Sequence, residues 1–330
     1  MTNSSLLTIT NYDLVISHSW NNPNNKDAPE HGICGHTFEM IEYFWLLRNK
    51  YNCCLLWTET MSREILTDIL ESKYNFDSKE IEQIVSNSIF KYRPKLLRAK
   101  NILLVDGQIN RDVGITMIYN HLFLFSCGNK DNHLIGDPKI TVLQDTRIYK
   151  DGPRVKHYVK KLLLHRHRFF LGNQNTSMLY LSKNCRASTL GEVEEIINHY
   201  NYDVFRHPSR HWLIVTDDPE RYKELDKKKF NYTIEQTPVL DLHERFNHYV
   251  YTPTPRQFDC SNRLLVECRH MTKMVSMWKI NQDYLTNDVG LNIRIHDIRG
   301  NSEDAYLDNV TLIRGNEDEI FKYIKEEIIL

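Results

Sequence analysis

The 330-residue sequence lacks the short motifs that usually mark a phosphate or metal site. It has neither a P-loop nor a Gly-x-Gly-x-x-Gly sequence. It also has no Asp-x-Asp, no Cys-x-x-Cys and no zinc-type spacing of Cys and His. Its seven cysteines follow no pattern, which favours a reducing compartment over a disulfide scaffold. We therefore expect no metal site, and a divalent metal would at most stimulate activity without being required for the fold.

Long apolar runs, charge excess and internal repeats are missing as well. Runs such as 122–125 are far too short to span a bilayer, and residues 1–5 have no basic or apolar leader. Lys and Arg number 42 against 43 Asp and Glu, so any surface that binds a polyanion must be a local patch. We expect a cytoplasmic monomer with no membrane partner.

What the sequence contains is an alternation of apolar strand patterns and helix patterns, typical of α/β layers with parallel strands. The first series predicts strands at 13–17, 53–57, 101–105, 122–126 and 140–143, with helices at 36–48, 61–74 and 78–85. The second predicts strands at 178–181, 212–215, 249–251 and 274–278, with helices at 189–199 and 317–328. Residues 172–175 have the composition of a linker, which predicts domains at 1–170 and 171–330.

Ligands of open α/β sheets bind beyond the carboxyl ends of the strands. The turn 182–189 joins a predicted strand to a helix and contains Lys183, Arg186 and Ser188. Two cations and small polar residues at a helix N-terminus suit phosphate oxygens. The alternative is a solvated loop with an N-cap. Ser19 also follows a predicted strand and is a further candidate for donor binding.

A second strand-end segment, 259–267, opens a predicted helix that Ser261 or Asn262 caps. Arg263 and Glu267 are four residues apart and share one helix face. The arginine suits a pyrophosphate and the carboxylate suits a ribose diol, which together indicate a nucleotide-sugar donor site. The alternative is a surface ion pair that contributes about 0.2–0.5 kcal/mol.

Transfer of a sugar needs a base that deprotonates the acceptor hydroxyl. Asp145, after the predicted strand 140–143, is the first choice. Asp106 is a second choice and His18 a third, although a carboxylate at a strand end is often only a turn former or a helix cap.

A basic tract follows Asp145, and Asp151 is the only acidic residue in it. Its eight cations are Arg147, Lys150, Arg154, Lys156, Lys160, Lys161, Arg166 and Arg168. Histidines and aromatic residues interleave with them, which indicates contact with a nucleic-acid backbone. A second basic patch covers 91–100 and contains no acid. The alternative for the tract is a solvated helix face whose residues 162–164 pack inward.

Taken in order, these segments resemble the bacteriophage DNA beta-glucosyltransferases of the GT-B fold, which modify 5-hydroxymethylcytosine. Residues 143–147 resemble the segment that contains the catalytic aspartate of that family, and Asp145 matches it. Arg186 falls where the family has diphosphate-binding arginines. Arg263 and Glu267 resemble its Arg-x-x-Glu pair, with a spacing one residue longer, so the contacts of Asn262, Arg263 and Glu267 are left open.

The resemblance implies two Rossmann-like domains that face each other across a cleft, an N-terminal domain for DNA and a C-terminal domain for the donor. It implies inverting transfer from a UDP-sugar to the hydroxymethyl group of 5-hydroxymethylcytosine in duplex DNA, in an infected host cell. UDP-glucose and UDP-arabinose are both compatible donors. Two alternatives stay open: a GT-B enzyme with a glycan or lipid acceptor, and a non-catalytic module that binds DNA or a nucleotide.

Overall fold

The computed structural model describes residues 6–18, 33, 35–57, 61–92, 97–105, 118–126, 137–144, 156–157, 172–181, 188–204, 210–225, 227–237, 239, 241–252, 264, 267–268, 271 and 273–278. Contacts divide the chain into two compact units, Met1–His167 with Ile313–Leu330, and Arg168–Leu312. The linker predicted at 172–175 is described, whereas 158–171 and the helix predicted at 317–328 lie outside the described residues. The predicted domain limits therefore stay a prediction.

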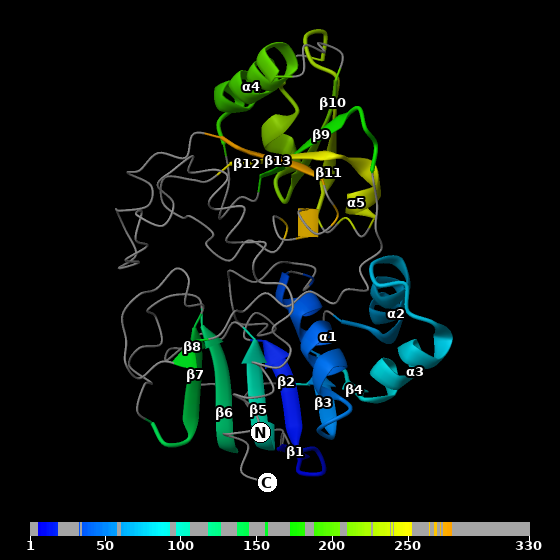
Figure 1. Ribbon diagram of the computed structural model, residues 1–330, viewed down its shortest axis with the longest axis vertical. Helices are drawn as coiled ribbons and strands as arrows, with labels where there is room; N and C mark the ends of the chain where they lie inside the picture. Colours follow the sequence, from blue (N-terminus) through cyan, green and yellow to red (C-terminus); the bar gives the residue numbers. More distant parts are fainter. Residues whose placement is uncertain are drawn as a thin grey trace, which may run out of the picture. The chain divides into compact units, whose positions relative to one another are not determined.

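The first unit is built on one parallel sheet (Figure 1). Its strands are β1 (Leu7–Ile9), β2 (Leu14–His18), β3 (Cys53–Leu56), β4 (Ser88–Ile89), β5 (Leu97–Val105), β6 (Ile118–Ser126), β7 (Ile140–Gln144) and β8 (Lys156–His157). They lie in the order β4-β3-β2-β5-β6-β7-β8, and β1 also pairs with β5. Val15 pairs with Ile102, and His18 at the end of β2 is level with Val105 at the end of β5. The order reverses between β2 and β5.

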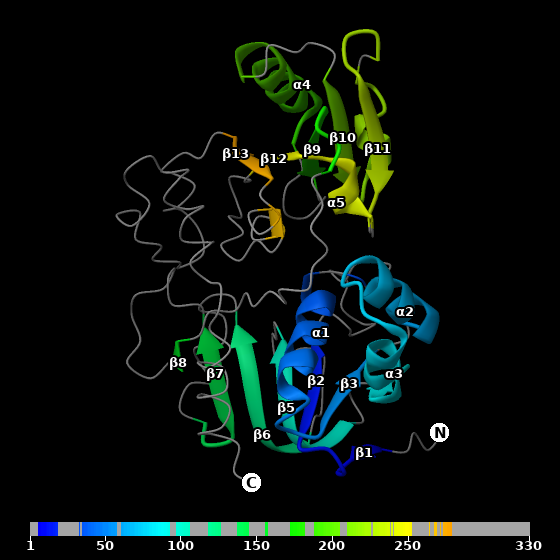
Figure 2. The same cartoon turned by 45° about the vertical axis from the view of Figure 1, so that its right-hand side comes forward.

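The described residues of this unit form the helices α1 (Gly35–Leu47), α2 (Arg63–Ser72) and α3 (Ser78–Ser86). Helix α1 packs on β2, β3 and β5 (Figure 2). Helix α2 begins where the Ser62 hydroxyl accepts a hydrogen bond from Ile65 N. Helix α3 begins with a capping box between Asp77 and Glu80. Local sequence thus fixes both starts, while buried apolar side chains such as Leu66 fix the packing.

The second unit contains a smaller parallel sheet. Its strands are β9 (Thr176–Leu181), β10 (His211–Thr216), β11 (Tyr232–Gln236), β12 (His248–Tyr251) and β13 (Met274–Met277), in the order β11-β10-β9-β12-β13. This is the order 3-2-1-4-5 that the first five strands of a doubly wound Rossmann fold adopt. The order reverses between β9 and β12, where Val250 pairs with Leu179.

Helices α4 (Leu190–Asn198) and α5 (Leu242–Arg245) of the second unit lie on opposite sides of this sheet. The described residues of this unit also form the π-helix η5 (His199–Val204) and the 3-10 helix η6 (Pro219–Tyr222). Figure 1 shows α4 on one side and α5 on the other. Val193 and Ile196 of α4 pack with Leu179 of β9 and Val250 of β12 in one buried cluster. Apolar burial of this kind stabilises by about 25 cal/mol per Å².

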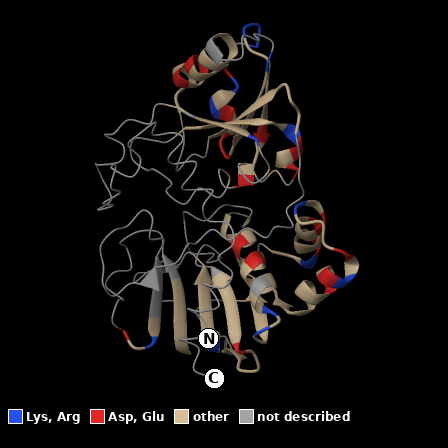
Figure 3. Ribbon diagram, viewed as in Figure 1, with Lys and Arg blue, Asp and Glu red and all other residues tan. Residues whose placement is uncertain are grey.

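Charged residues of the described part gather on the helices, whereas the strands carry few of them (Figure 3). The second basic patch, residues 91–100, has an acidic neighbour in the structure. Lys100 lies on β5 with its Nζ 3.5 Å from Oδ1 of Asp13, an acid that precedes β2. The structure therefore brings an acidic residue from a distant part of the chain to a segment that contains none.

The predicted α/β class with parallel strands is confirmed by both sheets. Four of the described strands were not predicted from the sequence, namely β1, β4, β8 and β11. Two of them have only two residues, and β11 is an edge strand that buries none of its side chains fully. Among the described residues no helix has the length and apolar content that crossing a membrane requires. The GT-B assignment stays a proposal.

Candidate functional site

The carboxyl edge of the second sheet is the first candidate site, because its strand order reverses there. Strand β9 ends at Leu181 and the neighbouring strand β12 ends at Tyr251. Helix α4, which follows β9, covers one side of the sheet, as expected for a right-handed crossover between parallel strands. A crevice forms at such a switch point and commonly binds a nucleotide. The segments 182–189 and 259–267, predicted from the sequence to bind the donor, come after these two strands in the chain.

The N-terminus of α4 is well defined. Thr189 is its N-cap, and its hydroxyl oxygen accepts a hydrogen bond from Glu192 N at 3.2 Å. Ser188, one of the predicted donor-binding residues, lies directly before this cap and is buried. The Ser188 carbonyl oxygen accepts a hydrogen bond from the Tyr222 hydroxyl at 3.2 Å. The backbone that enters α4 is therefore held from the next crossover, and the positive end of the helix dipole lies at the carboxyl edge.

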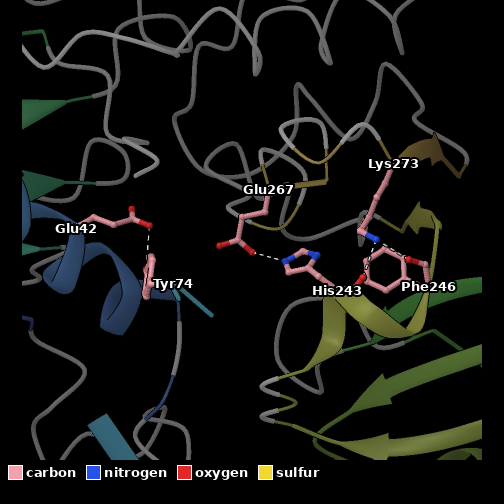
Figure 4. Close-up of polar contacts among 6 residues, drawn as sticks. All are labelled: Glu42, Tyr74, His243, Phe246, Glu267 and Lys273. Carbon is pink, nitrogen blue, oxygen red and sulfur yellow. Dashed lines mark hydrogen bonds and ion pairs between the residues drawn. The ribbon is translucent and has the colours of Figure 1, made fainter. Parts of the chain in front are cut away.

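Glu267 is the second described donor residue. Its backbone is helical, as predicted, and the residue is only 3% exposed. Oε2 of Glu267 lies 2.8 Å from Nε2 of His243, a residue of α5 (Figure 4). Glu267 is therefore buried against a histidine and does not lie on the surface. Arg263 itself lies outside the described residues, so its relation to Glu267 stays a prediction.

Lys273 holds the segment that contains His243 and Phe246 in place. Its Nζ donates hydrogen bonds to the carbonyl oxygens of His243, at 2.7 Å, and of Phe246, at 2.6 Å (Figure 4). Burial lowers the pKa of Lys273 to about 8, partly offset by Cys268. Gly172 packs here with a positive φ of 69°, and a Cβ at this position would lie 1.8 Å from the Phe246 carbonyl oxygen. The loop before β12 is thus tied to the start of this unit.

The amino edge of the sheet, where Phe246, Lys273 and Gly172 precede their strands, also contains a buried polar chain that the sequence did not reveal. Arg210 Nε donates to the Ser177 hydroxyl, which lies 2.9 Å from Nδ1 of His248. Nε2 of His248 lies 3.0 Å from the Ser276 hydroxyl. Burial, and then Arg210, lower the pKa of His248 to about 3, so its imidazole is neutral near pH 7. Its place away from the strand ends that bind ligands gives it a structural role.

In the first unit the switch point lies between β2 and β5. Ser17, near the end of β2, is fully buried and hydrogen-bonded to the hydroxyl of buried Tyr92. Burial raises the pKa of Tyr92 to about 12, opposed by the bond to Ser17, so this phenol is not a base near pH 7. The predicted base Asp145 follows Gln144, the last residue of β7.

Most predicted site residues lie outside the described residues. These are Ser19, Asp106, Asp145, Arg147, Lys150, Arg154, Lys160, Lys161, Lys183, Arg186, Ser261, Asn262 and Arg263. For Lys156 and His18 only the backbone is described, in β8 and β2. No described group of three or more His, Cys, Asp or Glu side chains could hold a metal ion, and the expectation that no metal is needed stays a prediction.

Comparisons with protein-family models, with curated proteins and with solved structures found no significant match to this chain. The class that the described residues define is therefore taken from the fold itself, an α/β chain whose two parallel sheets both reverse their strand order.

Proposed function

We propose that this chain is a GT-B glycosyltransferase that moves a sugar from a UDP-sugar to the hydroxymethyl group of 5-hydroxymethylcytosine in duplex DNA. One observation carries the proposal. The second sheet has the nucleotide-binding strand order, and the two segments with donor-type residues follow the two strands that flank its switch point. The resemblance of residues 143–147 and 263–267 to the phage enzymes supports the same reading.

In this mechanism Asp145 takes the proton of the hydroxymethyl group as its oxygen attacks the anomeric carbon. A new C–O bond forms on the face opposite the diphosphate. The bond between the anomeric carbon and the diphosphate oxygen breaks, its electron pair leaves with UDP, and the anomeric centre inverts. Arg186 and Arg263 stabilise the negative charge that grows on the leaving diphosphate.

Glu267 would hold the ribose hydroxyls of the donor. A carboxylate accepts hydrogen bonds from both hydroxyls of a diol, and His243 restricts its rotation. The basic tract would contact the phosphate backbone, and the target base would leave the stack to reach Asp145. Each of these roles uses a residue type suited to its ligand, without a resident cofactor.

The test uses the full chain, duplex DNA with 5-hydroxymethylcytosine, and a mixture of UDP-glucose and UDP-arabinose. Mass spectrometry of the nucleosides should find a hexose or a pentose added to the modified base, and none added to DNA with ordinary cytosine. Asp145→Asn, which keeps the side-chain volume, should abolish the product while UDP binding persists.

Two results would contradict parts of the proposal. UDP binding without transfer to any hydroxymethylated DNA would favour a glycan or lipid acceptor, or a non-catalytic module. Turnover retained by Asp145→Asn would remove Asp145 as the base and direct the search to Asp106 and His18.

A further inference from the structure

Thr252 occupies the switch point of the second sheet. It follows Tyr251, the last residue of β12, and is 2% exposed. Val250 pairs with Leu179 of β9, so two residues further along the same register Thr252 is level with Leu181, the last residue of β9. It therefore lies at the carboxyl edge, between the two strands where the sheet order reverses.

The side of the sheet that the Thr252 side chain occupies follows from strand alternation. Val250 packs with Val193 and Ile196 of α4 in one buried cluster. Thr252 is two residues further and shares the face of Val250. Helix α4 follows β9, so its first turn, after the N-cap Thr189, lies at the same carboxyl edge. The Thr252 hydroxyl and the N-terminus of α4 thus share one face and one edge of the sheet.

The Thr252 hydroxyl is buried and has no hydrogen-bond partner among the described residues. Buried hydroxyls are normally paired, because an unmade hydrogen bond costs free energy. Thr216, at the end of β10 on the same edge, follows the rule. Its Oγ1 donates to the Leu181 carbonyl oxygen at 2.7 Å and accepts from Asp218 N at 3.0 Å. The hydroxyl of Thr252 therefore differs from that of Thr216 and retains an unused capacity to donate a hydrogen bond.

The first turn of α4 also has room beside it. Gly191 is its second residue, and a Cβ built there would meet no atom of the described residues within 4 Å. Backbone N–H groups at a helix N-terminus bind phosphate, and a nearby hydroxyl adds a donor to the same anion.

We infer that Thr252 is a diphosphate-binding residue, whose hydroxyl donates a hydrogen bond to the UDP moiety of the donor at the N-terminus of α4. This inference rests on the proposed function and adds to it a residue that neither the sequence motifs nor the resemblance indicated. It also gives the site a hydrogen-bond donor that directly follows β12, the strand across the switch point from β9.

Titration calorimetry with UDP, on the full chain and three variants, tests the inference. Thr252→Val keeps the shape, removes the hydroxyl and breaks no hydrogen bond to a described residue. It should weaken UDP binding tenfold to a hundredfold, about 1.4–2.7 kcal/mol, with no loss of thermal stability. Thr252→Ser keeps the hydroxyl and should bind nearly as the unaltered chain does.

Thr176→Val is the matched control. Thr176 is also buried with an unpartnered Oγ1 among the described residues, but it is the first residue of β9, at the opposite edge of the sheet. The Thr176→Val variant should bind UDP with the affinity of the unaltered chain. Equal affinity of Thr252→Val and the unaltered chain would overturn the inference alone, as would equal weakening by Thr176→Val. A complete failure of the unaltered chain to bind UDP would overturn the proposed function as well.

Discussion

Nε2 of His243 lies 2.8 Å from Oε2 of Glu267, and both side chains are almost completely buried. A buried carboxylate that loses its hydrogen-bond donor costs roughly 3–5 kcal/mol. We therefore expect His243→Leu to lower the free energy of unfolding by about 3 kcal/mol in urea denaturation. Glu267→Gln keeps an oxygen that accepts from Nε2–H, and we expect a loss of only about 1 kcal/mol. Equal losses for the two variants would contradict this account.

The same pair gives a prediction about the donor. If Glu267 binds the ribose diol, Glu267→Gln should weaken UDP binding more than it weakens binding of 2′-deoxy-UDP. The expected difference is about 1–2 kcal/mol, because a charge-assisted hydrogen bond becomes a neutral one. Calorimetry with both nucleotides measures it. Equal weakening would mean that Glu267 acts only through folding, as its burial against His243 also allows.

His248 makes the second unit sensitive to acid. Its pKa of about 3 lies below the unfolded value of 6.5, so between these values the unfolded chain binds more protons. The contribution of His248 to stability is present above pH 6.5 and is lost as pH falls toward 3. Between pH 7 and pH 5 we expect a loss of about 2 kcal/mol. Urea denaturation at both pH values should show a smaller loss in His248→Gln, and an equal loss would contradict the prediction.

Lys273 makes the stability of the second unit depend on pH in the alkaline range. Its pKa of about 8 lies below the unfolded value of 10.5, so the unfolded chain again binds more protons between them. Stability due to this group therefore rises with pH from about 8 to 10.5. A neutral amine still has two N–H groups for the carbonyl oxygens of His243 and Phe246.

From pH 7 to pH 9.5 the unaltered chain should gain about 2 kcal/mol relative to Lys273→Met. Other titrating groups cancel in this comparison of urea midpoints. A gain that is the same in both proteins would show that Lys273 does not titrate in this range.

Two glycines provide opposite predictions. Gly172 has a φ of 69° and no space for a Cβ, since the Phe246 carbonyl oxygen would lie 1.8 Å away. Gly172→Ala should therefore destabilise by at least about 2 kcal/mol. Gly191 lies in α4 with open space around it, and Gly191→Ala should stabilise by about 0.5–1 kcal/mol. Thermal unfolding of both variants checks the signs, and destabilisation by Gly191→Ala would contradict the open space.

Sequence was sufficient for the α/β class because the central strands are continuous apolar runs. Residues 102–105, for example, lie within β5 and are all apolar and buried. The cap of α4 was also predictable, since Thr189 precedes Glu192 by three residues. These features depend on residues close together in the chain.

The strand orders and the His243–Glu267 pair were not predictable, because they depend on contacts between distant segments. Helix α5 has four residues and no clear helix pattern, so nothing in the sequence connects His243 to a carboxylate 24 residues later. The unpartnered hydroxyl of Thr252 is likewise visible only when its surroundings are known.

The basic tract after Asp145 yields the last prediction, which concerns DNA. Each phosphate that a Lys or Arg neutralises releases about one counterion, so the logarithm of affinity falls linearly with the logarithm of salt concentration. Lys160→Gln with Lys161→Gln should weaken DNA binding at low salt and reduce this slope by up to about two. Lys227→Gln with Lys228→Gln removes the same charge from the second unit and should leave the slope unchanged. Fluorescence anisotropy with duplex DNA at several salt concentrations measures the affinity and the slope for both pairs of substitutions.

Because the counterion term is independent of base modification, DNA with and without 5-hydroxymethylcytosine should give the same slope. A slope that both pairs of substitutions reduce equally would assign the effect to net charge and remove the tract as the DNA contact.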